Sequence, residues 1–345
     1  MLFHHTRIAA MAHALAPDVV SSEALEARLA PLYERFRLRS GRLELMSGIR
    51  ERRFWPAGTR PSAAASLAAE AALEKSQLDR SRLGCLIHAS VCRDFLEPAT
   101  ACVVHAQLGL SPDCTVFDLS NACLGVANGM ALVGGMIERG EIEAGMVVAG
   151  EDGRPLVEET IRELLLEQNQ TKSNLKAAFA SLTIGSGAAA VILERASAER
   201  PGQRLVGCSR LAASEHSALC QGDHAEGGSG LLMQTDSEAL LNAGNELAGR
   251  TFERFLGELD WTRESIQRVV THQVGSAHRR MLFETVGLDM QLDFPTVETL
   301  GNIGSVSLPL SFSIAEDAGH IQNGQRVAML GIGSGLNCMM LGLDW

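Results

Sequence analysis

The stretch DLSNACLGVANGM, residues 118–130, places a cysteine where a sulfur nucleophile would be effective. CTVFDL, which ends before Cys123, is typical of a buried strand, and GVANGMALVGGMIERG after it is typical of a helix that ends at Gly140. At such a strand-to-helix turn, free N–H groups and the helix dipole favour a thiolate, so the sequence predicts a lowered thiol pKa. The same N–H groups can hold the oxyanion that forms on an attacked carbonyl. On these flanks alone, a cysteine that only fills the core fits equally well.

Two segments of the second half carry residues that can assist such a nucleophile. THQVGSAHRR places His272 directly after an apolar strand, and ligands of α/β proteins bind at strand ends. GNIGSVSLP places Asn302 between Gly301 and Gly304, which let the chain approach a ligand closely. Each residue alone is more typical of a structural histidine or a turn. The conjunction of cysteine, histidine and asparagine in such settings favours a catalytic site.

Short apolar runs that alternate with helical patterns must position these residues. This alternation predicts an α/β fold with sheets covered by helices on both faces. The expected strands are 85–88, 114–119, 145–149, 188–193, 268–271 and 327–331. The expected helices are 63–74, 126–139, 156–167 and 237–259.

A weak internal repeat divides the chain into two similar halves. LDRSRLGCLIHAS (78–90) and LDWTRESIQRVVTHQV (259–274) share a helix end, a connector, a strand and a histidine. Both halves also end with IGSG followed by an apolar strand, at 184–195 and 332–343. Two matches in the same order favour a duplicated α/β unit. The boundary is expected in the polar stretch near residues 196–204, which gives an N-terminal half of 1–200 and a C-terminal half of 201–345.

Composition excludes several classes of protein. The 345 residues carry a net charge of −11, which argues against a nucleic-acid partner. Eight cysteines without C-x-x-C spacing favour reduced thiols in a cytoplasmic protein over a disulfide scaffold. No apolar run reaches the length of a membrane span. The Ala-rich start is only weakly hydrophobic, so we expect no signal peptide.

Five motifs in order resemble one family over nearly the whole chain. SGIRERR (47–53), NACLG (121–125), HQV (272–274), GNIGS (301–305) and GIGSG (331–335) are similar to those of the ketoacyl synthase III branch of the thiolase superfamily. The resemblance implies the thiolase fold, a duplicated five-layer αβαβα architecture, and a homodimer. It also implies coenzyme A thioesters as substrates and no metal or redox cofactor.

The resemblance assigns roles to individual residues. Cys123 would accept an acyl group from a thioester, and the N–H groups of Cys123 and Ser334 would form the oxyanion hole. His272 and Asn302 would donate to the thioester carbonyl of the second substrate and stabilise its enolate. The Cys/His/Asn set differs from the Cys/His/His elongating synthases and from the Cys/His/Cys thiolases.

A Leu-Glu-Pro turn in SVCRDFLEPATA (90–101) narrows the branch. It resembles the OleA family, the head-to-head acyl-CoA condensing enzymes of bacterial long-chain olefin synthesis. The resemblance implies that Glu97 crosses to the partner subunit and acts there as the base on the α-carbon of the second substrate. A fatty acyl thioester must lose an α-proton, whereas a malonyl donor loses CO₂ and needs no base. Without this resemblance, Glu97 would be interpreted as a solvated turn residue.

One part of the family pattern is absent. Initiating synthases carry a Trp and an Arg for the coenzyme A adenine where this chain has Arg42 and Met46, so those contacts cannot be carried over. The surrounding segment is nevertheless rich in arginine for so acidic a chain. Three of these arginines are candidates for coenzyme A phosphate contacts, with a charged surface loop as the equal alternative: Arg50, Arg52 and Arg53.

The sequence therefore predicts a non-decarboxylative Claisen condensation of two long-chain fatty acyl-CoA molecules to a β-keto acid, through an acyl-Cys123 intermediate. The alternative is a 3-oxoacyl-ACP synthase III that joins acyl-CoA to malonyl-ACP. A silent partner subunit is disfavoured because Cys123, His272 and Asn302 are all present. A thiol protease is disfavoured by the repeated α/β pattern. Enzymes downstream in an olefin pathway are the expected partners.

Overall fold

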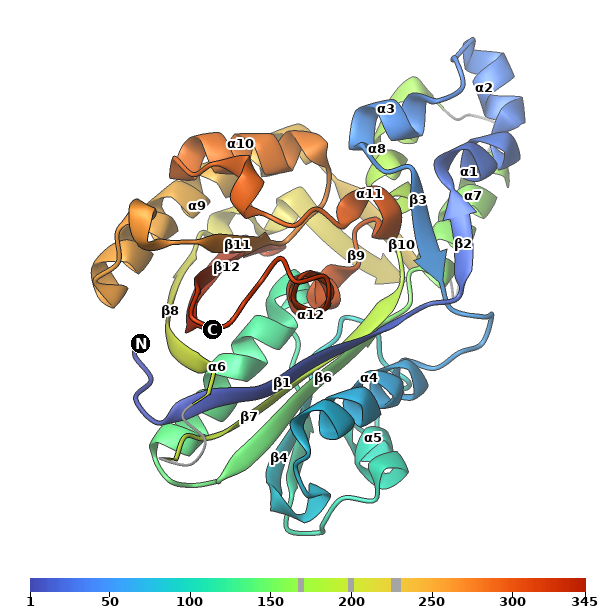
Figure 1. Ribbon diagram of the computed structural model, residues 1–345. Helices are drawn as coiled ribbons and strands as arrows, with labels where there is room; N and C mark the ends of the chain where they lie inside the picture. Colours follow the sequence, from blue (N-terminus) through green and yellow to red (C-terminus); the bar gives the residue numbers. More distant parts are fainter. Residues whose placement is uncertain (167–170, 198–201, 225–230) are drawn as a thin grey trace.

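The computed structural model describes residues 1–166, 171–197, 202–224 and 231–345. Within these ranges the largest sheet has nine strands in the order β11-β12-β13-β8-β1-β7-β6-β4-β5. One residue pair, Arg7 with Arg204, joins β1 to β8, so the sheet divides there into one sheet from each half of the chain (Figure 1). The strand bounds are β1 (Thr6–Leu15), β4 (Leu83–His88), β5 (Thr115–Asp118), β6 (Ala144–Glu151), β7 (Gly187–Arg195), β8 (Arg204–Ala212), β11 (Arg268–Thr271), β12 (Arg326–Gly333) and β13 (Asn337–Asp344).

Helices cover both faces of each sheet, which confirms the predicted α/β fold. Two helices pack on the outer face of the N-terminal sheet, two lie between the sheets, and two pack on the outer face of the C-terminal sheet. The resulting five layers are the αβαβα arrangement of the thiolase fold. In that order the helices are α4 (Pro61–Ser76) and α5 (Thr100–Leu108), α6 (Gly125–Glu138) and α12 (Ser307–Asp317), and α9 (Ser237–Leu259) and α10 (Ser276–Val286).

Burial on both faces explains why the strands read as continuous apolar runs. In β6, Met146 and Val148 pack in the outer cluster with α4, while Val147 and Ala149 pack in the central cluster with α6. The outer helix α4 approaches this sheet through small side chains on one face. These are alanines at helical spacing, each at most 1% exposed: Ala64, Ala65, Ala68, Ala69 and Ala72.

The two halves repeat the same strand arrangement. Antiparallel β6-β7-β1 in the first half corresponds to β12-β13-β8 in the second, and parallel β4-β6 corresponds to β11-β12. In both repeated segments a short 3-10 turn, Arg80–Arg82 or Arg263–Ser265, leads into a strand. The expected boundary falls between β7 and β8, partly on residues 198–201, which lie outside the described residues.

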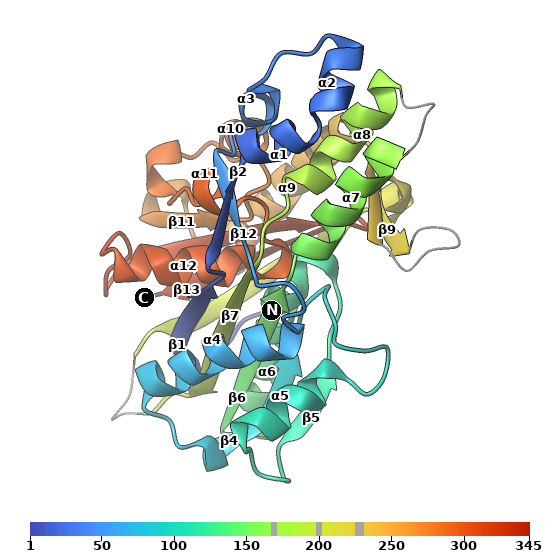
Figure 2. The ribbon, with the colours of Figure 1, turned by 90° about the vertical axis from the view of Figure 1, so that its right-hand side faces the viewer.

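A cap of short elements lies beyond one end of the two sheets (Figure 2). Its helices share an apolar cluster that includes Leu25, Tyr33, Ile161 and Phe179. The elements are β2 (Asp18–Ser21), α1 (Ser22–Arg28), α2 (Ala30–Phe36), α3 (Arg42–Ser47), β3 (Glu51–Phe54), α7 (Arg154–Leu166) and α8 (Lys172–Leu182). A hairpin of β9 (Cys220–His224) and β10 (Leu231–Thr235) packs against α7 and α8.

Several strands were not expected from the sequence. The Ala-rich start forms β1, which lies between β7 and β8 in the middle of the sheet. The β2–β3 and β9–β10 pairs are short and lack an apolar alternation, so their patterns resemble loops. In the described part of the chain, no helix has the length and apolar character needed to cross a membrane.

Candidate active site

Cys123 lies at the predicted strand-to-helix turn. β5 ends at Asp118, a 3-10 turn spans Ala122–Leu124, and α6 begins at Gly125 between the two sheets. Ala122 has φ 45°, a left-handed conformation that is rare for a residue with a Cβ atom. At Gly125 a Cβ atom would stand 2.2 Å from the carbonyl oxygen of Ala89, so only glycine lets the helix begin this close to the end of β4.

The GIGSG segment at the end of β12 packs against this turn. A Cβ atom at Gly333 would stand 3.0 Å from Cγ of Leu124 and 3.6 Å from the backbone nitrogen of Cys123. The backbone N–H groups of Cys123 and Ser334 act to lower the pKa of the Cys123 thiol, which places both of them near the sulfur. Two N–H groups near the nucleophile are what an oxyanion hole requires, so the predicted pair remains the candidate.

The Cys123 thiol differs from expectation in its acidity. Burial, followed by the negative charge of Glu151 and the nearby Cys220, raises the pKa of Cys123 to about 12. The donors at Cys123 and Ser334 act in the opposite direction but are outweighed. The predicted lowering of the pKa is therefore wrong for the free protein. A helix terminus contributes only about 0.3–1 kcal/mol, which is less than the cost of desolvating a thiolate in this position.

His272 follows directly after β11, and its backbone N–H donates to the carbonyl of Leu330 at 2.9 Å. Burial, with a smaller effect of His278, lowers the pKa of His272 to about 4. Among the described residues, nothing forms a hydrogen bond with its buried Nδ1. The ring is therefore neutral at pH 7 and can donate one N–H to a substrate oxygen without first gaining a proton.

Asn302 is fixed by its neighbours in a turn before α12. Its backbone N–H donates to the carbonyl of Thr183 (2.9 Å), and its backbone carbonyl accepts from the N–H of Gly185 (2.8 Å). Its side-chain Oδ1 accepts from the N–H of Gly304 at 3.1 Å, where φ is 58°. Because the oxygen of the amide is occupied, the NH₂ group is the free end. Asn302 is thus oriented as a donor.

Contacts between these three segments bring them to one junction. The Cys123 turn contacts both β12 and the Gly304–Val306 turn that follows Asn302. β11 and β12 are parallel, with Thr271 opposite Leu330, so His272 lies beside the same end of β12. The residue after His272, Gln273, donates its N–H to the hydroxyl of Ser307 at the start of α12 (3.3 Å). The fold therefore joins the cysteine of one half with the histidine and asparagine of the other.

Glu97 lies at an exposed loop tip beside Leu96, which is 95% exposed. The loop is held at both ends. At one end Asp94 accepts from the N–H and hydroxyl of Ser62 (2.9 and 2.6 Å), and at the other Asp118 accepts from the first two N–H groups of α5 (2.9 and 2.8 Å). The tip therefore projects from a fixed base.

The structure corrects one of the arginine predictions. Arg52 is fully buried, and its guanidinium donates to Ser22 Oγ (3.0 Å) and to the carbonyl of Leu182 (3.2 Å). Arg52 thus joins β3 to α1 and α8 within the cap, and it is not available to a phosphate because β3 directs its side chain inward. Arg53 is half-buried and donates to the carbonyl of Ala16 (3.2 Å), whereas Arg50 is exposed.

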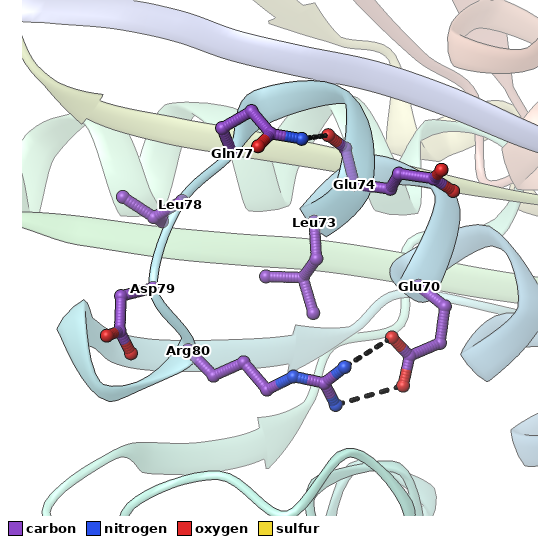
Figure 3. A pocket seen from close by; sticks show the side chains of 7 residues that line it. All are labelled: Glu70, Leu73, Glu74, Gln77, Leu78, Asp79 and Arg80. Carbon is purple, nitrogen blue, oxygen red and sulfur yellow. Dashed lines mark hydrogen bonds and ion pairs between the residues drawn. The ribbon is translucent and has the colours of Figure 1, made fainter.

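A surface hollow at the end of α4 holds no such chemistry (Figure 3). It is closed on one side by Arg80, which donates to both carboxylate oxygens of Glu70 at 3.0 and 2.7 Å. Its lining contains no cysteine, histidine or asparagine, and α4 lies in the outer layer, across the N-terminal sheet from α6. The lining residues are Glu70, Leu73, Glu74, Gln77, Leu78, Asp79 and Arg80.

Glu151 is a site residue that the sequence analysis did not single out. It is the last residue of β6, it is 5% exposed, and its charge acts on Cys123. The available signal was a carboxylate at the end of an otherwise apolar strand, AGMVVAGE. A buried acid at a strand end of an α/β sheet is a candidate functional residue.

Comparisons with known proteins find relatives over the whole length of the chain. Residues 256–345 match the family model of the 3-oxoacyl-[acyl-carrier-protein] synthase III C-terminal region. A protein of Shewanella oneidensis named acyl-CoA:acyl-CoA alkyltransferase is 44% identical over 351 residues, covering 100% of both chains. A Xanthomonas campestris protein of the same name is 36% identical over 345 residues, again covering 100% of both chains.

Solved structures of Xanthomonas campestris OleA have the same fold. One with bound cerulenin has a TM-score of 0.95 at 36% identity and covers 100% of this chain and 98% of that chain. Others carry substitutions at a cysteine, a histidine and a glutamate. The substituted glutamate precedes the substituted cysteine by 26 residues, the same separation as between Glu97 and Cys123.

Proposed function

The chain belongs to the acyl-CoA:acyl-CoA alkyltransferase family, the OleA-type condensing enzymes of the thiolase fold, and on this premise we propose that it joins two long-chain fatty acyl-CoA molecules head to head. The reaction is a non-decarboxylative Claisen condensation that yields a β-keto acid. The observation that carries the proposal is the junction of Cys123, His272 and Asn302, together with an anchored loop that presents Glu97 at the surface.

In the first step Cys123 attacks the thioester carbonyl of one acyl-CoA. The C–S bond to coenzyme A breaks, the acyl group moves to the Cys123 sulfur, and the thiol proton leaves with the coenzyme A thiol. The N–H groups of Cys123 and Ser334 hold the oxyanion of the tetrahedral intermediate. Because the free thiol is protonated at neutral pH, its proton must be lost as the new bond forms.

In the second step an enolate forms from the second acyl-CoA. Glu97 of the partner subunit removes a proton from the α-carbon, while the neutral ring of His272 and the NH₂ group of Asn302 donate to the carbonyl oxygen. The α-carbon attacks the acyl-Cys123 carbonyl, and the Cys123 thiolate leaves and regains a proton. Hydrolysis of the remaining thioester releases coenzyme A and the β-keto acid.

The loop of Glu97 supports its proposed action in a second copy of the chain. Leu96 is 95% exposed and Val91 is 55% exposed, which is unusual for large apolar side chains in one short loop. β5 lies at the edge of the sheet beside this loop, and unpaired edge strands are common sites of strand pairing between chains. A homodimer that covers these features would carry Glu97 into the neighbouring active site.

Several further assignments form part of the proposal. All steps are nucleophilic or acid–base chemistry of the residues named, so we propose that the enzyme uses no cofactor. Arg50 remains the candidate for a coenzyme A phosphate contact. The eight cysteines are all free thiols, which supports a cytoplasmic location. Enzymes that consume a β-keto acid, as in olefin formation, would be the partners.

Incubation of the purified enzyme with long-chain acyl-CoA alone tests the proposal. Mass spectrometry should find a β-keto acid, or the ketone formed by its loss of CO₂, and an acylated Cys123 peptide. Glu97→Gln should accumulate the acylated peptide without condensing, and Cys123→Ser should do neither. If product forms only with malonyl-ACP, or if Glu97→Gln condenses normally, the enzyme is instead a decarboxylating 3-oxoacyl-ACP synthase III.

A further inference from the structure

Three segments of the chain meet at the carboxylate of Glu151. Oε1 accepts from the N–H of Val91 (3.0 Å) and from the N–H and hydroxyl of Ser305 (3.4 and 2.5 Å). Oε2 accepts from the N–H of Cys92 at 3.3 Å. The backbone of Glu151 is fixed as well, because its carbonyl accepts from Nε1 of Trp55 at 3.1 Å. The position of this carboxylate is therefore set by its own strand and by two loops.

All of these donors are neutral, although the carboxylate is almost fully buried. In the part of the chain that the structure describes, Glu151 forms no ion pair with a basic side chain. A buried carboxylate is costly unless hydrogen bonds satisfy it, so the donors at 91, 92 and 305 must remain in place around it. Loss of any one of these hydrogen bonds would destabilise the buried carboxylate, so together they hold the two loops against the end of β6.

One of the loops is the turn that orients Asn302. Ser305 follows Gly304, and the N–H of Gly304 is the group that holds Oδ1 of Asn302 at 3.1 Å. A Cβ atom at Gly304 would stand 3.4 Å from the carboxylate carbon of Glu151, so the turn lies directly against the acid. Movement of Glu151 would therefore displace the group that fixes the Asn302 donor.

The other loop is the one that carries Glu97. Val91 and Cys92 are its first residues, and Ala89 and Ser90 connect them to the end of β4 at His88. The hydroxyl of Ser90 also accepts from the N–H of Gly150, which precedes Glu151, at 2.8 Å. The base of the Glu97 loop is thus bonded to the last two residues of β6.

We propose that Glu151 is a positioning residue that serves two active sites at once. Through Ser305 it fixes the Asn302 turn of its own subunit, and through Val91 and Cys92 it fixes the loop that presents Glu97 to the partner. The inference rests on the proposed function, since it assigns Glu97 to the neighbouring site. The role proposed for Glu151 is to hold these donors in place, whereas the base of the condensation is Glu97 of the partner subunit.

The charge of Glu151 provides a second readout. It is among the causes that raise the pKa of Cys123, after burial. Glu151→Gln removes this charge and replaces one acceptor oxygen by an NH₂ group, which cannot accept from Val91, Cys92 or Ser305. Ser305→Ala instead removes one donor and leaves the charge unchanged. The two substitutions therefore separate positioning from electrostatics.

The test measures three properties of each variant: the rate of Cys123 acylation by acyl-CoA, the rate of condensation, and the pH profile of Cys123 alkylation by iodoacetamide. Glu74→Gln, an exposed substitution in α4, is the control for loss of one negative charge. We expect Glu151→Gln to lower condensation by about 100-fold, the effect of displacing catalytic groups by about 1 Å, and to lower acylation less. Its alkylation profile should shift to lower pH, with the rate near pH 8 rising about tenfold.

Ser305→Ala should lower condensation without moving the alkylation profile. Circular dichroism and thermal melting establish whether the variants are folded. If Glu151→Gln is unfolded, Glu151→Asp, which keeps the charge, is used in its place. The Asp variant should keep the wild-type alkylation profile and still condense slowly. The proposal is overturned if folded Glu151 variants condense at the wild-type rate, or if acylation and condensation fall equally while the profile stays unchanged. Failure of the wild type to condense acyl-CoA would instead overturn the proposed function.

Discussion

The proposal that Glu97 of one subunit acts in the active site of the other predicts the activity of mixed dimers. The loop tip at Glu97 is exposed and is anchored at both ends on its own subunit, through Asp94 and Asp118, so a dimer would present Glu97 to the partner from a fixed base. A dimer of one Cys123→Ser chain and one Glu97→Gln chain can be purified through two different affinity tags. Each homodimer of these chains lacks one required group at both sites.

The expected activity follows from the composition of each site. In the mixed dimer, one site combines the intact Cys123 of the Glu97→Gln chain with the intact Glu97 of the Cys123→Ser chain. One of the two sites is therefore complete, and the dimer should condense acyl-CoA at about half the wild-type rate. Each homodimer should lose the factor of about 10² to 10⁴ that a general base contributes, or more for the loss of the nucleophile.

The reverse arrangement provides the control. When both substitutions are placed on one chain and the partner is wild type, neither site has both Cys123 and Glu97 if the glutamate acts between subunits. Condensation of acyl-CoA, measured by release of coenzyme A thiol, should then be lost. Half activity in this dimer and none in the other would refute the reasoning, because Glu97 would then act within its own subunit.

Two further predictions concern pH and packing. The pKa of His272 is about 4 in the folded protein, below its ordinary value of 6.5. As the pH falls from about 6.5 to 4, only the unfolded state therefore binds a proton at this ring. The free energy of unfolding should decrease by up to about 3 kcal/mol over this window. Urea unfolding at both ends of this pH window should show a smaller decrease in the free energy of unfolding for His272→Asn than for the wild type. Equal decreases in the two proteins would contradict a buried neutral ring. Gly125→Ala should cost about 1–3 kcal/mol and lower acylation, since its Cβ atom would stand 2.2 Å from the oxygen of Ala89. Gly257→Ala, in a helix with no atom within 4 Å of the new Cβ, should be neutral or stabilising in the same thermal melts.

The strands and helices that carry the site were predictable where their patterns are local. The expected strand 268–271 and helix 237–259 coincide with β11 and α9, and the Cys123 turn lies where apolar strand gives way to glycine-rich helix. β1 was missed because TRIAAMAHAL has neither strict alternation nor a β-branched run. Its strand conformation depends on pairing with β7, whose residues are distant in sequence.

The site itself was only partly predictable, and the difference has one physical cause. Residue type, spacing and motif order sufficed to select Cys123, His272 and Asn302, because these depend on the chain near each residue. Desolvation depends on what packs around a group from the rest of the chain. Only the tertiary structure could therefore place the pKa of Cys123 at about 12 and bury Arg52 within the cap. For the same reason only the fold revealed Glu151, whose partners come from segments near residues 91 and 305.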